Sequence, residues 1–560
     1  MVGKERLSTT IDMCGANNPE QRAQLVMHLL ILVLMSLLMA VHLHYRSPDF
    51  PFTADSAVYF EQARNLVNVG SALNTPYGLT PADKDQVESG IFPIGFPIVI
   101  AVVSSLGFDA KVAVTGIGHL SAILLPWLLY FCLRNALGSV CALVIAGLSL
   151  MSPGILVNSP MGLTDVLSLA IVVGAIGLIL NSVSAWSFIF GGMLAGMAYA
   201  VRNAHLALLI TIALYFCCVW LISTPERRRL VYKQAANFVG GVSIIVLPLL
   251  TRNLLLFGSL NPYQMPPSTI GFIENSRTYI QALLKDITAC GDCATYIAWS
   301  IPGLLLFAIA TLCLIWLFVK YEWVNLEDVR KRAILFSIIY IIVGSCIVIA
   351  ARTRYQWGEV INLRHTLQYT PFVFSILMAI VFGQSQRLSK IRWFLVAFLV
   401  LFHANFALSF DSTKKKSSYP MLLSAYQTGE SHLCASEKDV FLVSNWAEVF
   451  RIQCNARVRY ISYIAPARNK EALTLIGDNE GYASLMDAIA DIKNKAMGRP
   501  IHAGFFPGKS GLEFSNFPLS DTDQQVLLDS SWTIIRNDKR GLLIQHGRMG
   551  RAKRNPSKNW

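Results

Sequence analysis

The sequence predicts a polytopic α-helical membrane protein with about eleven transmembrane helices, followed by a small C-terminal extracytoplasmic α/β domain. The first observation is composition: 54% of the 560 residues are hydrophobic and only 14% are charged, whereas soluble domains carry roughly 25% charged residues. The second is a mean hydropathy of +0.48. The third is a series of apolar runs long enough to cross a hydrocarbon core of about 30 Å, which takes about 20 helical residues.

Eleven apolar runs divide the chain up to residue 410. They lie near 24–45, 112–133, 138–157, 164–181, 184–201, 204–223, 234–250, 300–319, 333–350, 366–383 and 392–410. The first is longer than the apolar part of a signal peptide, so we expect a retained helix. The stretch 91–106 is also apolar, but it is short and opens with two prolines. This favours an interfacial or re-entrant helix, with a spanning helix open as the alternative.

Basic clusters in short loops predict the orientation. Those at 225–233, 329–332 and 385–392 are typical of cytoplasmic loops. Counting the predicted spans outward from these clusters places segment 1–23 in the cytoplasm. The outer face receives loop 46–111, the turn "NSPMGLTD", loops 251–299 and 351–365, and all residues after 410.

The chain carries a net charge of +13. Its cations lie mostly in loops and in the tail, where membrane topology and anionic lipid account for them. No nucleic-acid-binding motif is present, and we expect no nucleic acid partner.

The composition changes after residue 410. Within 411–547, "KDVFLVSNWAEVFRIQCNARVRYIS" predicts strand, helix and strand, and "GYASLMDAIADIKNKA" predicts an amphipathic helix. "RPIHAGFF" predicts a further strand, and "SWTIIRNDKRGLLIQH" predicts a hairpin. This length suffices for one small α/β domain. Residues 548–560 are basic and are expected to form a disordered tail.

Two cysteine pairs lie in predicted outer segments: Cys290 with Cys293, and Cys434 with Cys454. The single CxxC motif lacks the second half of a zinc site. In an oxidising compartment we expect it to form a local disulfide, and free thiols are the alternative. The pairing of Cys434 with Cys454 stays open.

Two acids at predicted helix starts on the outer face are candidate catalytic groups. Asp55 and Tyr59 are four residues apart, so they share a helix face, and Asp165 directly precedes an apolar span. Ionisable groups close to hydrocarbon are costly and tend to be functional. The alternative for both acids is helix capping, because aspartate at a helix start binds free N–H groups. Solvated loop charges are expected at Asp83, Asp85 and Glu88.

A set of cations is predicted at the outer ends of spans, against the usual preference for the cytoplasmic face. The set comprises Arg202, Arg252, Arg352, Arg354, Arg364 and His365. This placement requires an anionic partner, and a phosphate is a strong candidate because a guanidinium matches its oxygens bidentately. The alternatives are snorkelling, or pairing with Asp55, Asp165 or Glu359.

A lipid-linked phosphate beside an aspartate indicates group transfer. An aspartate can deprotonate an acceptor hydroxyl, and arginines can stabilise a phosphate as it leaves. The chain has no P-loop, HExxH, GxSxG or Rossmann glycine motif. This argues against ATP hydrolysis, zinc proteolysis and serine hydrolysis.

Five segments occur in a recognisable order: "DSAVYFEQARNLVNVG" with "FPIGFPIVIAVV", then "NSPMGLTDVLSLAIVVGAIGLIL", "LAGMAYAVRNAHLALLI", "VLPLLTRNLLLFGSLNPY" and "RHTLQYTPFVF". Over about 24–410 the chain thereby resembles the GT-C membrane glycosyltransferases of the protein O-mannosyltransferase type, a superfamily that includes the lipid A aminoarabinose transferases. It departs from the family at Ser56, where many relatives have glutamate. It also departs at Asn203, where proline is usual, and at His365, where tyrosine is common.

The resemblance implies a GT-C fold in the transmembrane glycosyltransferase domain 24–410. It implies transfer of a sugar, with inversion, from a polyprenyl-phosphate donor to a hydroxyl of a glycan, lipid or protein. The catalytic acids are then Asp55 and Asp165, the first of them in loop 46–111. By their motif positions Arg252 and Arg364, and more loosely Arg202, are expected to bind the donor phosphate, and Arg354 is added to them from the set of outer cations. Pocket residues are expected at Tyr59 and His365. No metal or other cofactor is expected.

The bacterial style of the motifs favours a multi-pass protein of the bacterial inner membrane, with its site facing the periplasm and membrane lipids around it. A transporter or flippase of a lipid-linked sugar is the main alternative. It would favour broken, charged helices in matching halves, and no such symmetry is seen. A membrane-anchored binding protein, with its function in the C-terminal domain, is a third possibility. The sequence names neither the sugar nor the acceptor.

Overall fold

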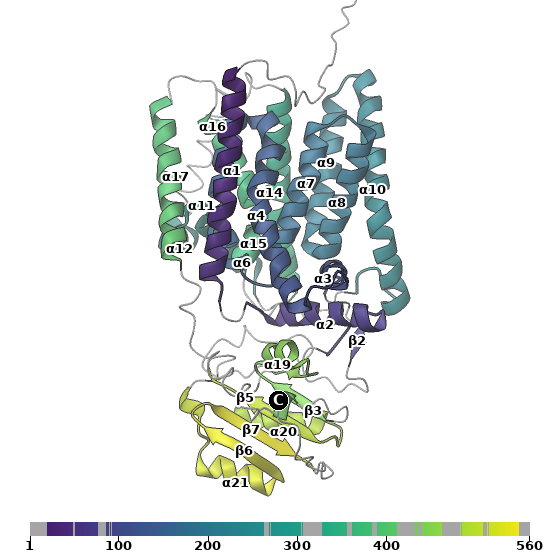
Figure 1. The fold of residues 1–560 in the computed structure, drawn as a ribbon, viewed down its shortest axis with the longest axis vertical. Coiled ribbons are helices and arrows are strands. Elements are labelled where there is room, and N and C mark those ends of the chain that lie inside the picture. Colours follow the sequence, from purple (N-terminus) through teal and green to yellow (C-terminus); the bar gives the residue numbers. More distant parts are fainter. Residues whose placement is uncertain are drawn as a thin grey trace, which may run out of the picture.

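The computed structural model describes residues 19–48, 51–76, 86–88, 90, 92–262, 268, 270–303, 305, 328–355, 361–382, 389–410, 432–434, 440–461, 482, 484–507, 512 and 514–547. They form a helical bundle with a sheet-containing unit at one end (Figure 1). The expected tail 548–560, most of segment 1–23 and most of the span expected at 300–319 lie outside the described residues.

Apolar helices make up the bundle. They are α1 (Pro19–Arg46), α4 (Ala110–Leu137), α5 (Ser139–Leu150), α7 (Asp165–Asn181), α8 (Ala185–Val201), α9 (Leu206–Ile222), α10 (Pro225–Phe257), α14 (Asp328–Arg354), α16 (Thr370–Val381) and α17 (Ser389–Ser409). Further elements lie between them in the chain. These are α2 (Ala54–Val69), β1 (Leu73–Asn74), β2 (Val87–Glu88), α3 (Gly95–Ser105), α6 (Pro153–Asn158), η1 (Asn203–His205), α11 (Phe272–Thr288), α12 (Gly291–Trp299) and α15 (Leu363–Thr366).

Five helices in the described part of the chain are long and apolar enough to cross a membrane: Pro19–Arg46, Ala110–Leu137, Asn203–Ile222, Pro225–Phe257 and Val329–Arg354. The chain is therefore an integral membrane protein, and α1 exposes a row of leucines that suits contact with lipid. Six further apolar helices have 10–17 residues. The predicted count of eleven spans is therefore not confirmed.

The span predicted at 138–157 is two helices rather than one. Helix α5 ends at Leu150, and α6 begins at Pro153 with Ser152 as its N-cap. Proline has no N–H group to continue a helix but fits the first turn of a new one. Within the apolar stretch 91–106, Gly95–Ser105 form the 11-residue helix α3, which at about 1.5 Å per residue is too short to cross the hydrocarbon core.

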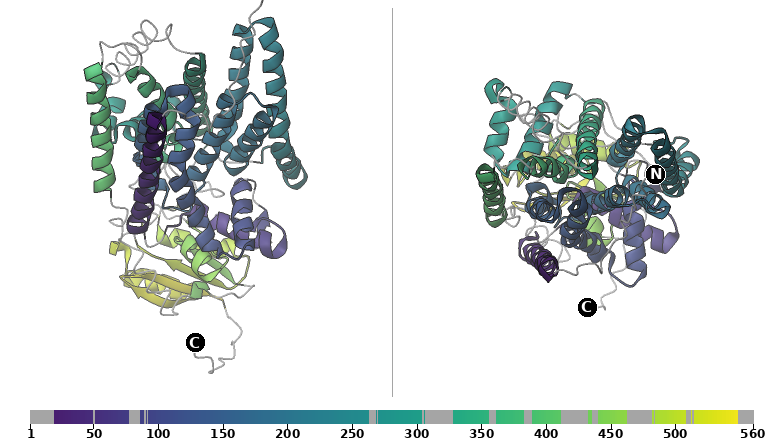
Figure 2. Two further views of the ribbon diagram at one scale, coloured as in Figure 1. Left: turned by 45° about the horizontal axis from the view of Figure 1, so that its top comes forward. Right: turned by 90° about the horizontal axis from the view of Figure 1, so that it is seen from above.

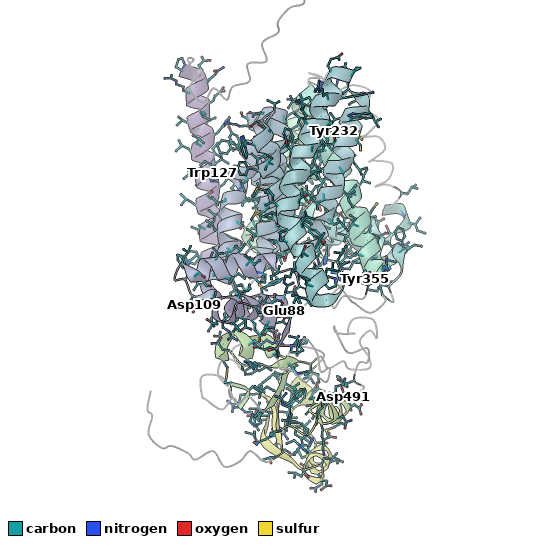
Figure 3. All side chains as sticks on the ribbon, turned by 90° about the vertical axis from the view of Figure 1, so that its right-hand side faces the viewer. Glu88, Asp109, Trp127, Tyr232, Tyr355 and Asp491 are labelled. Atoms are coloured by element: carbon teal, nitrogen blue, oxygen red, sulfur yellow. A yellow bond between two sulfur atoms is a disulfide. The ribbon has the colours of Figure 1, made fainter. Side chains whose placement is uncertain are left out.

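The elements that carry the candidate residues gather at one end of the bundle, which we call the site end. Helices α2, α3, α6 and α15 lie there in Figure 1. Glu88, Asp109 and Tyr355 are labelled near this end in Figure 3, whereas Tyr232, in the basic cluster 225–233, lies toward the opposite end. The separation of the outer loops from this basic cluster follows the sequence-based prediction.

Residues 440–547, which we call the C-terminal unit, lie against the site end (Figures 1 and 2). Its elements are β3 (Phe441–Ser444), α19 (Ala447–Cys454), β4 (Arg459–Tyr460), α20 (Leu485–Lys495), β5 (Ile501–Phe505), η7 (Phe514–Asn516), α21 (Asp521–Asp529), β6 (Trp532–Asp538) and β7 (Gly541–His546). The strands form one sheet in the order β4-β3-β5-β7-β6. Strand β3 is parallel to β4 and β5, and the remaining pairs are antiparallel.

The sheet of the C-terminal unit is covered by apolar side chains on both faces. Along β3, Phe441 and Val443 belong to one buried cluster and Leu442 to another, as expected because successive strand residues point to opposite faces. The predicted strands, amphipathic helix and hairpin are all present as β3, α19, β4, α20, β5 and the pair β6–β7. A disulfide joins Cys434, in η6 (His432–Cys434), to Cys454 at the end of α19.

The other cysteine pair is also bonded. Cys290 and Cys293 form a disulfide at the start of α12. The expectation of a local disulfide in the CxxC motif is therefore confirmed, and the free-thiol alternative is wrong for this pair.

A buried carboxylate joins several helices near the site end. Asp286, on the amphipathic helix α11, is fully buried. It accepts hydrogen bonds from the N–H of Gly154, in the first turn of α6, and from the hydroxyl of Thr370, at the start of α16. Its carbonyl oxygen lies 3.3 Å from Nε2 of His403 on α17. Burial raises the pKa of Asp286 to about 6, although these hydrogen bonds and the charge of Lys285 lower it.

Replacing Asp286 with asparagine is expected to destabilise the protein in a pH-dependent way. The pKa of Asp286 is higher in the folded protein, about 6, than its ordinary value of 3.8. The stability that this carboxyl group contributes is therefore fully present below pH 3.8 and is lost as the pH rises through about 6. The destabilisation by Asp286→Asn should therefore be larger at about pH 5 than at about pH 7.5. Thermal unfolding of both proteins in detergent measures this difference. A destabilisation that is equal or larger at the higher pH would contradict it.

Candidate active site

Helix α2 presents Asp55 in its first turn. The helix is capped by Thr53, whose side chain accepts a hydrogen bond from the N–H of Ser56, while the Ser56 hydroxyl accepts one from the N–H of Thr53. This reciprocal arrangement satisfies two of the free N–H groups at the helix start. The capping interpretation of Asp55 is therefore wrong, because Thr53 is the cap and the Asp55 carboxylate binds elsewhere.

The start of α2 is hydrogen-bonded to the turn that precedes α7. The hydroxyl of Ser56 donates to the carbonyl oxygen of Gly162 over 2.7 Å, and the N–H of Gly162 donates to the carbonyl oxygen of Pro51 over 2.8 Å. Ser56 is fully buried. The residue that departs from the family pattern thus holds together the two segments that carry Asp55 and Asp165.

Asp165 is the first residue of α7, and its side chain is 0% exposed. Its carboxylate pairs with Arg202, which lies between α8 and η1, and with Nε of Arg364 at 3.2 Å. The side-chain amide of Gln368 donates to the backbone carbonyl of Asp165 over 2.7 Å. Since the preceding residue, Thr164, is the N-cap, capping does not describe Asp165 either; its carboxylate anchors two arginines.

One guanidinium connects both acids. Arg364 lies in the short helix α15, where Asn362 is the N-cap and accepts a hydrogen bond from the N–H of Arg364 at 3.0 Å. Nη2 of Arg364 lies 3.0 Å from Oδ2 of Asp55, and Nε lies 3.2 Å from Oδ2 of Asp165. The side chain of Asp55 is 28% exposed and that of Asp165 is 0% exposed. We call Asp55, Asp165, Arg202 and Arg364 the acid–arginine cluster.

His365 lies directly beside this cluster. Its ring contacts the guanidinium of Arg352, and its Nδ1 lies 3.1 Å from both the backbone nitrogen and the side-chain oxygen of Asn362. Burial, and then the charge of Arg352, hold the pKa of His365 well below its ordinary value. The imidazole is therefore neutral at pH 7 and helps to fix α15 without adding charge.

Tyr59 lies beneath the cluster, one helical turn after Asp55. It is buried, with the rings of Phe92 and Phe96 in edge-to-face contact at centroid distances of 5.7 and 5.2 Å. Its hydroxyl is hydrogen-bonded to the side chain of Thr164, and burial followed by the charge of Asp55 raises its pKa. The phenol therefore stays protonated and supports the turn before α7.

Two predicted phosphate-binding arginines make separate contacts. Arg252 pairs with Glu88 on β2, and Glu88 also accepts a hydrogen bond from the hydroxyl of Ser71. The prediction that Glu88 is a solvated loop charge is wrong, since its side chain is 18% exposed and paired. Arg354 is exposed, with its guanidinium 5.3 Å from the centroid of the Tyr355 ring. Predictions for Asp83, Asp85 and Glu359 fall outside the described residues.

Sequence reasoning missed several residues that hold the site. Gln368 and Thr53 drew no prediction, and Arg352 drew no role of its own. A threonine followed three residues later by serine is weaker evidence of a capping box than the usual pairing with glutamate. For Gln368, its spacing of four residues from Arg364 is compatible with a shared helix face, but nothing in the sequence identifies a backbone carbonyl of α7 as its partner.

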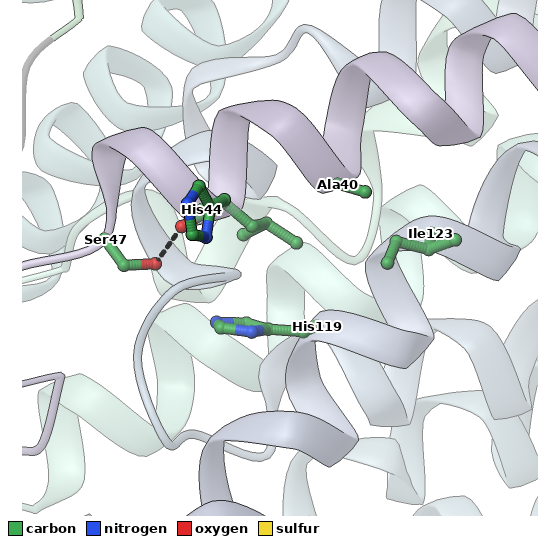
Figure 4. Close-up of a pocket in the computed structure, with 6 residues that line it drawn as sticks. Ala40, His44, Ser47, His119 and Ile123 are labelled. Atoms are coloured by element: carbon green, nitrogen blue, oxygen red, sulfur yellow. Dashed lines mark hydrogen bonds between the residues drawn. The ribbon is translucent and has the colours of Figure 1, made fainter.

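The described residues contain no group of three or more His, Cys, Asp and Glu side chains that could hold a metal ion. The expected independence from metals stays a prediction. A cavity of about 320 Å³ lies between α1 and α4 (Figure 4), and its lining includes no member of the acid–arginine cluster. It is lined by Ala40, Leu43, His44, Ser47, His119 and Ile123.

Comparison with known proteins identifies the fold. No protein-family model matches the chain, and no curated protein matches it in sequence. Among solved structures, it is similar to ArnT from Cupriavidus metallidurans bound to undecaprenyl phosphate. The identity is 11% and the TM-score 0.56, over 93% of this chain and 99% of that chain. The apo state of the same ArnT gives a TM-score of 0.52 at 11% identity, over 95% and 100% of the two chains.

A more distant similarity is to the archaeal oligosaccharyltransferase AglB from Archaeoglobus fulgidus, in complex with an inhibitory peptide and a dolichol-phosphate. It has 12% identity and a TM-score of 0.49, over 85% of this chain and 69% of that chain. The ArnT structures cover the bundle and the C-terminal unit together. The chain therefore has the fold of these ArnT structures.

A side chain at Gly162 is expected to disturb the contact between the two acid-bearing segments. A Cβ atom there would collide with Cγ1 of Val114 and lie 3.3 Å from the hydroxyl oxygen of Ser56. Overpacking of this kind costs about 1–3 kcal/mol, so Gly162→Ala should lower the unfolding temperature in detergent. Gly116→Ala on α4 is the control, because its Cβ would have nothing within 4 Å. Equal unfolding temperatures for the two variants would contradict the tight packing of this turn.

Proposed function

We propose that the protein is an inverting membrane glycosyltransferase that moves a sugar from a polyprenyl-phosphate donor to a hydroxyl acceptor. The observation that carries the proposal is the bridge formed by Arg364 between the exposed Asp55 and the buried Asp165. The GT-C fold supports it, since the similar ArnT structure holds undecaprenyl phosphate. A flippase is not favoured, because moving a lipid-linked sugar requires no partly exposed carboxylate beside two arginines.

Binding of the donor would change the partners of Arg364. A phosphate competes with carboxylates for a guanidinium, since both offer pairs of oxygens to its planar donors. Asp55 is the carboxylate that can be displaced, because it is partly exposed and has water to solvate it. Asp165 is fully buried, so losing both arginines would leave an uncompensated buried charge. We therefore assign Asp165 to positioning Arg202 and Arg364, and Asp55 to contact with the acceptor.

In the transfer step the acceptor oxygen attacks the sugar carbon that is bonded to the donor phosphate. The new bond joins that carbon to the acceptor oxygen, and the bond from carbon to phosphate oxygen breaks. The proton of the acceptor hydroxyl passes to the Asp55 carboxylate. The electron pair leaves with the polyprenyl phosphate, whose added charge is stabilised by Arg364 and Arg202. Attack on the side opposite the leaving phosphate inverts the configuration at the sugar carbon.

The remaining predicted residues would act around this centre. Arg252 lies at the site end with Glu88 as its partner, and Arg354 is exposed at the end of α14, so both remain proposed contacts for the donor phosphate. His365 and Tyr59 would keep α15 and the turn before α7 in place. We place the reaction on the outer face of a bacterial inner membrane, where the predicted outer loops and the C-terminal unit would lie. The donor sugar and the acceptor are not assigned.

Asp55→Asn is expected to abolish sugar transfer while leaving the protein folded. Asparagine keeps the size of the side chain but cannot accept the proton, and loss of a general base costs roughly 10²–10⁴-fold in rate. The measurement is transfer of radiolabel from a membrane-extracted polyprenyl-phosphate sugar fraction to a new molecule. Asp109→Asn is the matched control, because Asp109 is an exposed N-cap aspartate near the same end and asparagine also caps helices. Full transfer by Asp55→Asn would contradict the assignment of Asp55 as the group that accepts the proton.

A further inference from the structure

The C-terminal unit covers part of the helix that carries Asp55. Helix α19 lies beside α2 (Figure 1). Ile452 on α19 is fully buried and shares one apolar cluster with Ala57, Tyr59 and Phe60 of α2. The C-terminal unit is thus packed directly against α2, and the cluster includes the tyrosine that supports the active-site turn.

A buried arginine links the C-terminal unit to the first loop. Arg451, next to Ile452, is 2% exposed. Its Nε donates to the carbonyl oxygen of Val458 over 2.7 Å, and its Nη2 lies 3.2 Å from the carbonyl oxygens of both Thr75 and Pro76. Burying a guanidinium is costly unless its donors are satisfied. These backbone contacts therefore hold residues 75–76 firmly against α19.

The clamped residues are in turn bonded to α2. The hydroxyl of Thr75 donates to Oε1 of Glu61 over 2.6 Å, and Glu61 is buried on α2. The side-chain amide of Asn65, also on α2, donates to the carbonyl oxygen of Leu73 over 2.7 Å. Strand β1 pairs with β2, which carries Glu88, the partner of Arg252. A continuous set of contacts therefore runs from Arg451 to α2 and to Arg252.

We propose that Arg451 is a positioning residue for the active site, through which the C-terminal unit holds α2 and orients Asp55. Arg451 does not touch the acid–arginine cluster; it acts through Thr75 and Glu61. The C-terminal unit is then a structural part of the catalytic centre rather than an appended module. The effect on catalysis rests on the proposed function, whereas the effect on the position of α2 does not.

Hydrogen–deuterium exchange of the full chain in detergent tests, without any substrate, whether Arg451 holds residues 75–76 and α2 in place. Arg451→Met keeps an apolar stem of similar length and removes the guanidinium donors. Losing a charge-assisted hydrogen bond raises the population of a locally open state, and we expect exchange of the amides in 57–76 to rise about tenfold.

Arg499→Met is the matched control for the exchange experiment. Arg499 donates to the carbonyl oxygen of Val440 over 3.2 Å within the C-terminal unit. Its replacement should leave exchange in 57–76 unchanged. Unchanged exchange in Arg451→Met, with the bundle helices still protected, would overturn the proposal.

A second variant covers the case in which Arg451→Met fails to fold. Thr75→Val removes only the hydroxyl that joins the clamped segment to Glu61. It should raise exchange along α2 while leaving α19 and the sheet protected. Exchange that stays at the wild-type level in α2 would overturn the proposal by this route as well.

A kinetic comparison separates the clamp from the proposed reaction. In the transfer assay Arg451→Met should lower kcat at least tenfold and change KM for the donor less than about twofold, because Arg202 and Arg364 are held by Asp165 and not by Arg451. A rise in KM with kcat unchanged would overturn the positioning role. If the wild-type chain transfers no sugar, the proposed function fails. The exchange results still test whether Arg451 holds residues 75–76 and α2 in place.

Discussion

The structure of the site depends on one guanidinium that binds two carboxylates. Arg364 bridges Asp55, at the start of α2, and Asp165, at the start of α7. Each acid alone would be a charge held near hydrocarbon, which is costly without a partner. Paired in this way, the acids and arginines neutralise one another. Under the proposed function, a phosphate would enter the site by exchanging one anion for another rather than by creating new charge.

The surrounding contacts hold in fixed relative positions the three chain segments that carry Asp55, Asp165 and Arg364. Ser56 binds the carbonyl of Gly162, Gln368 binds the carbonyl of Asp165, and Asn362 caps the helix of Arg364. Backbone carbonyls are suitable anchors because their positions follow from the helices and turns and not from flexible side chains. Arg451 extends the same principle to the C-terminal unit. The side chain of Asp55 is partly exposed and that of Asp165 is enclosed, and the two proposed roles follow this difference.

Much of this arrangement was accessible from sequence, and the limits have physical reasons. Apolar runs and the basic cluster 225–233 indicated a bundle whose candidate residues share one end, and residue type selected Asp55, Asp165, Arg202 and Arg364. Which arginine meets which acid was not accessible, because Arg364 and Asp55 are 309 residues apart and no periodicity relates them. The capping interpretation failed because Thr53 was the better cap. The pairing of Glu88 with Arg252 depends on the β1–β2 hairpin, whose two-residue strands are too short to show a pattern.

We propose that Arg364 exchanges a carboxylate for the phosphate of a lipid donor. The most direct test is a titration of undecaprenyl phosphate against the full chain in detergent, comparing wild type with Arg364→Gln. Arg540→Gln is the control, since Arg540 is also paired with a carboxylate, Asp538 at 3.2 Å, but lies in the β6–β7 turn of the C-terminal unit. We expect the affinity for undecaprenyl phosphate to fall at least tenfold in Arg364→Gln and to be unchanged in the control. Equal affinity in all three proteins would contradict it.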